Sequence, residues 1–531
     1  MTKVYKFLVL VLFFITVTSR FLILDKVPPS LSNDEISIAY DSYSILHTGR
    51  DEHNNFMPAS FQSHNTYKAP FYIYAATITN YFLGNSEYSV RLPSAIFGSL
   101  TVFLLGYLVF FLSKSVNLSL ITAYILALSP WHIYSSRMAL ESNAAIFLLL
   151  TALLFLFKVI KSKNNFYLFL SMGFFALSIW AYHTEWLLTP LLMLFLVIYY
   201  RKSYKVNSFF ILAILFFGVL IFPIAKDAWV NRNTNARANT EIITKDRGLQ
   251  NIIGNTNNSL LMKAKVIGQS FFTNYSDYVR PSHLFFDGMP LLPKEDPYTV
   301  GLFLLPLLPF FYWGLFKIKK FFPVDFKFIY FWIFISPVIP SITIGGTNMV
   351  RNLASVLPYS IVIGCGFLDL LPYLKKTRIY VFSILIIVSL LYFGAIYYYH
   401  FPFQMGENFQ YGYKQAAEYI SENYNKYDQI IVDPRFGDVN IYVGVPHLYL
   451  AYFTKLDPNK MLSRKDTDNG LFFDKYRISS INWNQEIILP RSLYLVPFDN
   501  LPPVKIENLY TAKEIKLPNY KVEFKLLEST N

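Results

Sequence analysis

The sequence has little cysteine and little charge. Among 531 residues there is one cysteine, Cys365, which lies inside an apolar run. An intrachain disulfide and a cysteine-based metal site are therefore excluded. Charged residues make up 15% of the chain, whereas 54% of its residues are hydrophobic and 18% are aromatic. This composition excludes an ordinary soluble globular protein and places the chain in a lipid bilayer.

A cleavage site and a nucleic-acid surface are also missing. The first segment, MTKVYKFLVLVLFFITVTSRFLIL, has Lys3 and Lys6 before an apolar run, and no small-x-small pattern follows it. We therefore expect an uncleaved first transmembrane helix. The net charge of +13 lies largely in short loops, and the C-terminal region has no basic face or aromatic platform, so nucleic acid is not an expected partner.

Long apolar runs are abundant, and each can cross about 30 Å of hydrocarbon at about 1.5 Å per residue. They lie near 7–24, 90–112, 117–132, 141–157, 166–182, 185–200, 207–225, 298–316, 327–344, 353–371 and 379–399. The sequence therefore predicts a polytopic α-helical membrane protein with about 11 transmembrane helices.

Short basic loops give this protein a predicted orientation. The loops after the fourth, sixth, eighth and tenth runs contain Lys158, Lys161 and Lys163; Arg201, Lys202 and Lys205; Lys317, Lys319 and Lys320; and Lys375, Lys376 and Arg378. Such loops are typical of the cytoplasmic side. We expect a plasma (inner) membrane protein with a cytoplasmic N-terminus and an extracytoplasmic C-terminal domain.

The sequence divides into a membrane module, residues 1–399, and a C-terminal region, residues 400–531. Within the module, outer loops are expected at 25–89 and 226–297, and the short run 70–84 predicts an interfacial helix because it begins with proline and ends with glycine. In the C-terminal region, a helix near 412–425 followed by a strand near 429–433 predicts a small extracytoplasmic α/β domain.

The first outer loop contains two adjacent carboxylates, Asp34 and Glu35. Ser32 and Glu35 have the S-x-x-E spacing of a capping box, and Gly49 is a suitable helix stop, so helix capping can explain both acids. The alternative starts from their place beside a membrane exit. There, a carboxylate can act as general base on the acceptor of a lipid-borne substrate, provided that cations hold the departing phosphate.

Three outward cations can fill that second role. Lys68 precedes the predicted interfacial helix, and Arg351 lies at another membrane entry, although each can instead contact lipid headgroups. Arg137 and Glu141 are four residues apart, so on one helix they would pair with each other. His183, at a further outward turn, and Glu35 are the candidates for a divalent metal site. Ionisable groups at several membrane exits favour a functional site.

Three segments together resemble a known family: LSNDEISIAYDSYSILHTGRDE, YKAPFYIYAATITNYFLGNSEYSVRLPSAIFGSLTVFLLG and SPWHIYSSRMALESNAAIFLLL. In order and spacing they are similar to glycosyltransferase family 39, the protein O-mannosyltransferase and aminoarabinose-transferase-like membrane enzymes of the GT-C fold. The resemblance covers about residues 5–200 and is thinner at TNMVRNLASVLPYSIVIGCG.

The resemblance implies a glycosyltransferase that moves a hexosyl or pentosyl unit from a polyprenyl phosphate to a protein, lipid or polysaccharide acceptor, on the outer face and with inversion. It implies catalytic roles for Asp34, as general base, Glu35 and Glu141. It also implies donor-phosphate binding by Lys68, in KAP where relatives have KPP, by Arg137 and by Arg351. Some relatives use a divalent metal near this site.

Two other classes of function remain open at the level of the sequence. A protein that binds or flips a polyprenyl-phosphate sugar without transfer would need the cations but not Asp34. A scaffold of a surface-polymer assembly complex would use its C-terminal domain and none of these loops. The sugar, the acceptor and the length of the lipid do not follow from the sequence.

Overall fold

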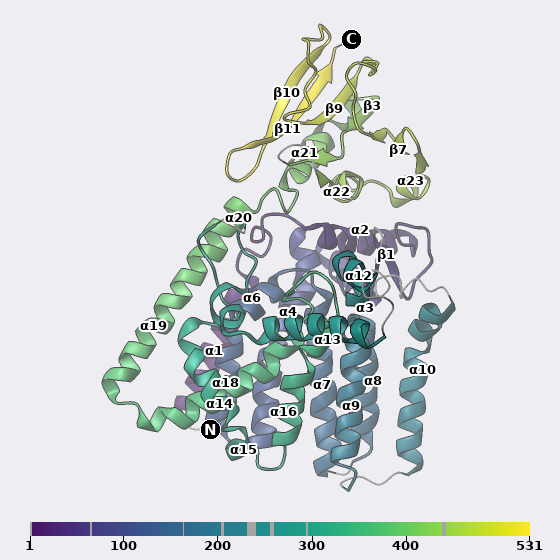
Figure 1. The fold of residues 1–531 in the computed structure, drawn as a ribbon. Helices are drawn as coiled ribbons and strands as arrows, with labels where there is room; N and C mark the ends of the chain where they lie inside the picture. The colour runs from purple at the N-terminus through teal and green to yellow at the C-terminus, as the bar shows by residue number, and fades with distance from the viewer. Residues whose placement is uncertain are drawn as a thin grey trace.

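In the computed structural model, the chain forms a helical bundle with a smaller α/β domain at one end (Figure 1). The structure describes residues 3–63, 66–162, 164–202, 207–230, 241–254, 260–293, 296–437 and 442–530.

The bundle contains every apolar run that the sequence predicts as membrane-spanning. Within the described ranges, six helical segments are long and apolar enough to cross a membrane on their own. They comprise α1 (Lys3–Phe21), α4 (Glu87–Ser113), α7 (Glu141–Ser162), α10 (Ser208–Val230), α18 (Val356–Leu370) and α19 (Lys376–Ala395), with their short helical extensions. Four further apolar segments are shorter: α8 (Phe166–Ala181), α9 (Glu185–Tyr199), α14 (Leu308–Leu315) with the turn before it, and α16 (Phe326–Ile335) with α17 (Val338–Ser341).

Two of the predicted runs differ from a simple helix. The run 117–132 bends by 59° between α5 (Val116–Ala127) and α6 (Pro130–Arg137), because Ser129 caps the new helix and Pro130 occupies its first turn. The run 298–316 is helical only from Leu305. Before that point its backbone pairs with the chain near Met289, which takes the place of helical hydrogen bonds.

One end of the bundle has the basic loops and the other has the C-terminal domain. Figure 1 shows the N-terminus and α15 (Ile318–Phe321), which contains Lys319 and Lys320, at the end far from that domain. The basic loops therefore lie opposite the loops that contain the predicted site residues.

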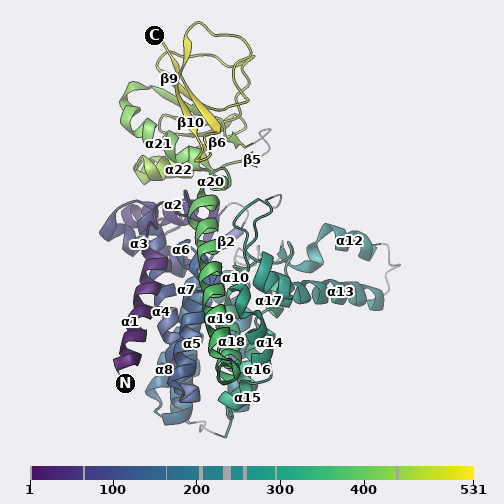
Figure 2. The same cartoon turned by 90° about the vertical axis from the view of Figure 1, so that its left-hand side faces the viewer.

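The first outer loop forms a layer between the bundle and the C-terminal domain (Figures 1 and 2). It contains α2 (Asn33–Thr48), a hairpin of β1 (Phe61–Ser63) and β2 (Thr66–Lys68), and α3 (Pro70–Leu83), which matches the predicted interfacial helix. Large apolar side chains at the end of α3, including Tyr81 and Phe82, are exposed. In the second outer loop, α12 (Arg247–Gly254) and α13 (Leu260–Val279) project sideways (Figure 2).

The C-terminal domain is built on a seven-stranded sheet with the order β10-β11-β9-β3-β8-β7-β6. Its strands are β3 (Gln429–Val432), β6 (Lys465–Thr467), β7 (Gly470–Phe473), β8 (Tyr476–Ile478), β9 (Ser492–Pro497), β10 (Leu509–Lys516) and β11 (Val522–Ser529), beside a small pair of β4 (Arg435–Phe436) and β5 (Tyr442–Val443). β3 is parallel to β8 and β9, and the other pairs are antiparallel. The predicted helix and strand are confirmed as α21 (Tyr411–Asn423) and β3.

The domain shares a hydrophobic core with the first outer loop. Ile36, Tyr40 and Tyr43 of α2 belong to the same buried cluster as side chains of α21 and of α22 (Pro446–Phe453). The short helices α20 (Phe401–Gln404) and α23 (Pro458–Leu462) complete the described helices of this region. The C-terminal domain is therefore packed on α2 rather than tethered by a linker.

Candidate functional site

α2 begins with the capping box that the sequence predicts. The Ser32 hydroxyl accepts a hydrogen bond from the Glu35 amide at 3.3 Å, and the Glu35 carboxylate accepts one from the Ser32 amide at 3.0 Å. Gly49 ends the helix in the left-handed conformation, with φ of 69°. The first turn of α2, with its two acids, is thereby fixed in place.

The Glu35 side chain is buried in an ion pair with Arg91 of α4. The Arg91 Nε and Nη2 atoms donate to the two carboxylate oxygens at 2.9 and 3.1 Å. The Ala139 amide, in the link between α6 and α7, donates to the same carboxylate at 2.9 Å. With the Ser32 amide, four N–H groups saturate this carboxylate and leave it no free face for a substrate.

The side chain of Asp34, the residue before Glu35, is exposed instead of buried. Its side chain is 77% exposed, and its Oδ1 atom lies 3.3 Å from Nζ of Lys68, whose own side chain is 4% exposed. The Lys68 ammonium also donates to the Asp34 carbonyl at 2.7 Å. The structure thus brings together two of the predicted site residues. The carboxylate of Asp34 is accessible, and the ammonium of Lys68 contacts both the carboxylate and the carbonyl of Asp34.

A small apolar cluster lies under the other predicted residues. We call it the apolar floor; it consists of Ala145, Leu148, Ala181 and Tyr182. Phe71 and Val350 pack against it. Each predicted residue is a near neighbour in sequence of a residue in or against this cluster. The four pairs are Lys68 with Phe71, Glu141 with Ala145, His183 with Tyr182, and Arg351 with Val350. Segments from four distant parts of the chain therefore converge on one place at the end of the bundle.

Glu141 and Arg351 come from different segments, the start of α7 and a turn before α18. Glu141 is nearly buried at the first position of α7, which Asn143 fixes to α4 by donating to the Ser94 carbonyl at 2.8 Å. The Arg351 guanidinium is 17% exposed and pairs with Glu241, Nη2 to Oε2, at 3.0 Å. It also donates to the hydroxyl of Thr343 at 2.9 Å. A ligand anion at Arg351 would meet a cation that already has a carboxylate partner.

Arg137 contacts backbone carbonyls around the end of α1. Its guanidinium is buried and donates to the carbonyls of Ser19, Ile23 and Val27 at 3.2, 3.3 and 2.9 Å. It therefore satisfies carbonyls at and beyond the end of α1, a common use of arginine at a helix C-terminus. Arg137 ends α6 and Glu141 begins α7, so the two do not share one helix, which the alternative of an i, i+4 pair requires.

The two candidate metal ligands, Glu35 and His183, do not form part of a ligand cluster among the described residues. Within the part of the chain that the structure describes, no three His, Cys, Asp or Glu side chains are grouped closely enough to share a metal. Of the two candidates, Glu35 is saturated by Arg91 and by backbone amides. The His183 ring packs beside Trp186, with 5.2 Å between ring centroids. No reaction step is assigned to a metal.

Sequence reasoning missed a group of acids beside Lys68. Asp41 lies two helical turns after Asp34, a spacing that places it on the same face of α2, and its side chain is buried. Its Oδ1 atom accepts from the Glu52 amide at 3.0 Å. Burial, and then the nearby charge of Glu52, raise the pKa of Asp41 well above its ordinary value, whereas the charge of Lys68 acts against this rise. The Asp41 carboxyl therefore holds its proton to a higher pH than an ordinary aspartate does.

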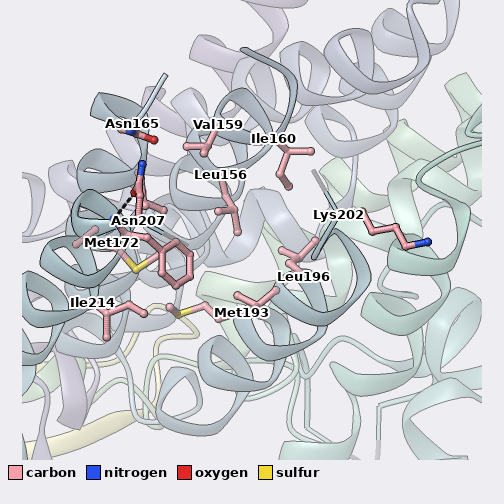
Figure 3. A pocket seen from close by; sticks show the side chains of 14 residues that line it. Leu156, Val159, Ile160, Asn165, Met172, Met193, Leu196, Lys202, Asn207 and Ile214 are labelled. Carbon is pink, nitrogen blue, oxygen red and sulfur yellow. Dashed lines mark hydrogen bonds between the residues drawn. The ribbon is translucent and has the colours of Figure 1, made fainter. Parts of the chain in front are cut away.

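A separate apolar cavity lies at the opposite, basic end of the bundle. It has a volume of about 290 Å³ and is enclosed by α7, α8, α9 and α10 (Figure 3). Leu156, Met172 and Met193 are among its apolar lining residues, and Asn165 and Lys202 come from the basic loops. The cavity is thus distinct from the site around Asp34.

Comparison with known proteins supports the likeness to family 39. Residues 67–225 match the family described as dolichyl-phosphate-mannose-protein mannosyltransferase. This stretch includes Lys68, Arg137, Glu141 and His183. No curated protein sequence matches the chain at a significant level.

The whole chain is similar in fold to solved membrane proteins. ArnT from Cupriavidus metallidurans, in the apo state, has a TM-score of 0.54 and 12% identity over 99% of this chain and 97% of its own. The same protein bound to undecaprenyl phosphate has a TM-score of 0.54 and 10% identity over 98% and 97%. AglB, an oligosaccharyltransferase from Archaeoglobus fulgidus in complex with an inhibitory peptide and a dolichol-phosphate, has a TM-score of 0.50 and 11% identity over 85% of this chain and 64% of its own.

The sequence match covers the central helices, and the structural match covers the bundle and the C-terminal domain. Residues 67–225 thus carry the sequence pattern of the mannosyltransferase family, and the chain as a whole has the fold of the GT-C membrane glycosyltransferases.

Proposed function

We propose that this protein transfers a monosaccharide from a polyprenyl-phosphate donor to an acceptor, on the face of the membrane that has the C-terminal domain. The observation that carries the proposal is the pairing of an exposed carboxylate, Asp34, with a buried ammonium, Lys68, at the end of a GT-C bundle. The family match and a fold relative with bound undecaprenyl phosphate support a lipid-phosphate donor.

In the proposed reaction, the Asp34 carboxylate takes the proton of an acceptor hydroxyl or amine as that group attacks the anomeric carbon. The bond from this carbon to the phosphate oxygen breaks on the opposite face, so the configuration inverts. Polyprenyl phosphate leaves with the electron pair. Because negative charge develops on the phosphate, a fixed cation beside it stabilises the transition state more than the ground state.

Lys68 is the proposed phosphate ligand, because its ammonium is already desolvated and oriented by Asp34. Arg351 is the proposed second cation, and Glu241 holds it until a donor phosphate competes for the guanidinium. Glu141 is the proposed second acid at the acceptor side.

Two residues that the resemblance suggests for chemistry receive positioning roles in this proposal. Glu35 fixes the first turn of α2 to Arg91 and to Ala139, and so sets where Asp34 and the start of α7 lie. Arg137 holds the end of α1 against α6. Four N–H groups saturate Glu35, and Arg137 donates to three backbone carbonyls, which is the environment of a structural side chain.

The basic loops support the proposed orientation. They lie at the end of the bundle opposite the C-terminal domain, as the positive-inside rule requires if that domain is extracytoplasmic. The site would then be open to the outer leaflet, where a lipid-linked sugar presents its phosphate at headgroup level.

The test is sugar transfer by the full-length protein in lipid, from a panel of labelled polyprenyl-phosphate monosaccharides to acceptor-bearing membrane extract. We expect Asp34→Asn to lower turnover by about 10²–10⁴-fold, the range of general base catalysis, with donor binding retained. Lys68→Ala should weaken donor binding. The matched controls are Asp25→Asn and Lys26→Ala, because both residues are exposed just before α2. They should behave as wild type.

A different outcome would identify a different function. If wild-type protein binds donor in a Lys68-dependent manner but never consumes it, and Asp34→Asn changes nothing, the protein binds or flips a lipid-linked sugar. If no donor binds, the protein neither transfers nor flips these lipid-linked sugars.

A further inference from the structure

The C-terminal domain has an open crevice where its parallel strands end. β3 lies between its two parallel neighbours, β8 and β9. The chain leaves all three strands at the same edge of the sheet, in loops that begin at Asp433, at Ser479 and at Phe498. In open α/β sheets, ligands bind in the crevice outside the carboxyl ends of the strands, where neighbouring connections diverge. Here this crevice has a volume of about 410 Å³.

A single buried carboxylate ties the three loops together. Asp433 accepts hydrogen bonds from Nε of Arg435 at 2.9 Å, from the Ile481 amide at 3.2 Å and from Nδ2 of Asn500 at 2.9 Å. Each donor comes from a different loop, and the Asp433 side chain is fully buried. The crevice is therefore preformed and rigid, which lowers the entropic cost of binding a ligand there.

The walls combine an indole ring with side-chain amides. Trp483 donates through Nε1 to the Asn500 carbonyl at 2.7 Å, which fixes its ring, and it remains partly exposed. Asn482 and Asn484 flank it and are exposed. Amides both donate and accept hydrogen bonds, as sugar hydroxyls do, and an indole offers a flat apolar surface to the C–H face of a pyranose. The charge of Arg435 is largely balanced by Asp433, so the crevice does not demand an anion.

We propose that this crevice binds a saccharide. The open shape suits a chain that continues beyond the site, and the polar lining suits a ligand rich in hydroxyl groups. The binding itself does not depend on the function proposed above. That the bound saccharide is the acceptor does rest on it.

The position of the crevice relative to Asp34 fits an acceptor. The Pro434 carbonyl, beside Asp433, accepts from the hydroxyl of Tyr413 at 3.0 Å, at the start of α21. Gln410, just before α21, accepts from the Val445 amide and donates to the side chain of Asn33, the residue before Asp34. The crevice edge of the sheet and the first turn of α2 thus both contact the start of α21, which is the direction in which an acceptor chain would have to extend to reach Asp34.

The test is binding of the full-length protein in lipid nanodiscs to immobilised oligosaccharides of hexoses, N-acetylhexosamines and uronic acids, with unstructured peptides beside them. We expect at least one saccharide class to bind. Trp483→Ala and Asn484→Ala should each weaken that binding by about tenfold or more. Asn484 is exposed, so its variant checks the result if Trp483→Ala destabilises the domain. The controls are Tyr520→Ala, at an 81% exposed position, and Asn508→Ala, at an exposed position outside the crevice.

The outcomes separate the two proposals. Binding of peptides alone, no saccharide binding, or saccharide binding that Asn484→Ala and Trp483→Ala leave unchanged would overturn the crevice proposal, whatever the transfer assay shows. Saccharide binding without sugar transfer would leave the crevice proposal standing and count against the transferase. Where both hold, the two crevice variants should raise KM for a saccharide acceptor, with kcat and the donor KM unchanged.

Discussion

Asp34 and Glu35 are neighbours in the chain, yet their carboxylates have opposite surroundings. The S-x-x-E spacing predicts the capping role of Glu35, and the structure confirms it. The same pattern cannot show that Arg91, 56 residues further on, saturates Glu35, or that Asp34 points to solvent. Local hydrogen bonds could be predicted from local sequence. Which acid is buried depends on the packing of α2 against α4, which the sequence pattern does not specify.

Breaking the Glu35–Arg91 pair tests the positioning role. Glu35→Gln leaves the buried Arg91 charge without its counter-ion, and we expect a loss of about 3–5 kcal/mol in stability. The double variant Glu35→Gln, Arg91→Met removes both charges but also the donors to the carbonyls of Leu24, Pro28 and Ser30, so it should recover part of that loss, measured by thermal unfolding in one detergent. A double variant no more stable than the single variant would contradict the unpaired Arg91 charge as the cause of the loss.

The buried Asp41 carboxyl gives a second prediction for a single residue. Since burial raises its pKa well above the ordinary value, the folded state keeps a proton that the unfolded chain loses. Stability is therefore lost as the pH rises above the unfolded pKa of about 4. Asp41→Asn removes this loss and keeps an oxygen for the Glu52 amide. We expect it to raise the unfolding midpoint at about pH 8 and to have little effect near pH 4.

A control variant distinguishes this titration from a general effect of removing an acid. Asp25→Asn, at an exposed position just before α2, should shift the midpoint little at either pH. A benefit of Asp41→Asn that stays the same from pH 4 to about 8 would contradict the titration argument.

The ends of the membrane helices matter more for the site than their middles. Hydrophobic runs predicted where the helices lie, because period and length are local properties. They did not predict the 59° bend at Ser129 and Pro130, after which Arg137 of α6 contacts the chain that follows α1, or the break between α6 and α7 that separates Arg137 from Glu141. Ser129-Pro130 was a visible start signal within an apolar run. The contact of Arg137 with α1 was not visible, because it joins residues more than 100 positions apart.

The ion pair of Glu241 with Arg351 joins two chain segments and can be tested by mutation. A backbone bridge between Ile242 and Thr343 brings Glu241 to Arg351, where in the proposed function the carboxylate would compete with a donor phosphate. Glu241→Gln should therefore tighten donor binding by up to about fivefold, the worth of one partly exposed ion pair. Arg351→Gln should weaken it. Binding of a fluorescent polyprenyl phosphate in nanodiscs measures both. Weaker binding by Glu241→Gln would mean that the pair supports the site instead of masking it.

Over the whole molecule, the C-terminal domain and α2 form one structure. Leu31, Tyr40 and Tyr43 share a buried cluster with Tyr413 and Tyr449. The sequence predicted an α/β domain from its helix and strand, but its packing on α2 joins residues about 400 positions apart, which no local pattern reports. Deleting the domain would therefore expose the apolar face of α2 beside Asp34. Point variants in the crevice, and not truncation, are the suitable test of its role.

Glu523 is a titratable residue that connects β11 of the C-terminal sheet to α21, near the junction of this domain with α2. Its Oε2 atom accepts from the amide of Gly412, at the start of α21, at 3.0 Å. Burial, and then the charge of Glu407, raise the pKa of Glu523 from 4.5 to about 8. Between these values the folded state binds a proton that the unfolded state has released. The free energy of unfolding must therefore fall as the pH rises from about 4.5 to about 8, and this contribution is fully lost above that range.

Glu523→Gln should remove that dependence, because the amide oxygen still accepts from Gly412 and carries no charge at any pH. We expect wild-type protein to become more sensitive to protease in its C-terminal domain as the pH rises from about 6 to about 9, and the variant to change much less. Glu507→Gln, at an exposed position of the same domain, is the control and should follow wild type. Parallel pH profiles for wild type and Glu523→Gln would show that another group governs the junction. Since α21 packs against the sheet and against α22, which in turn contacts α2, a loosened junction should also reduce sugar transfer in the same pH range.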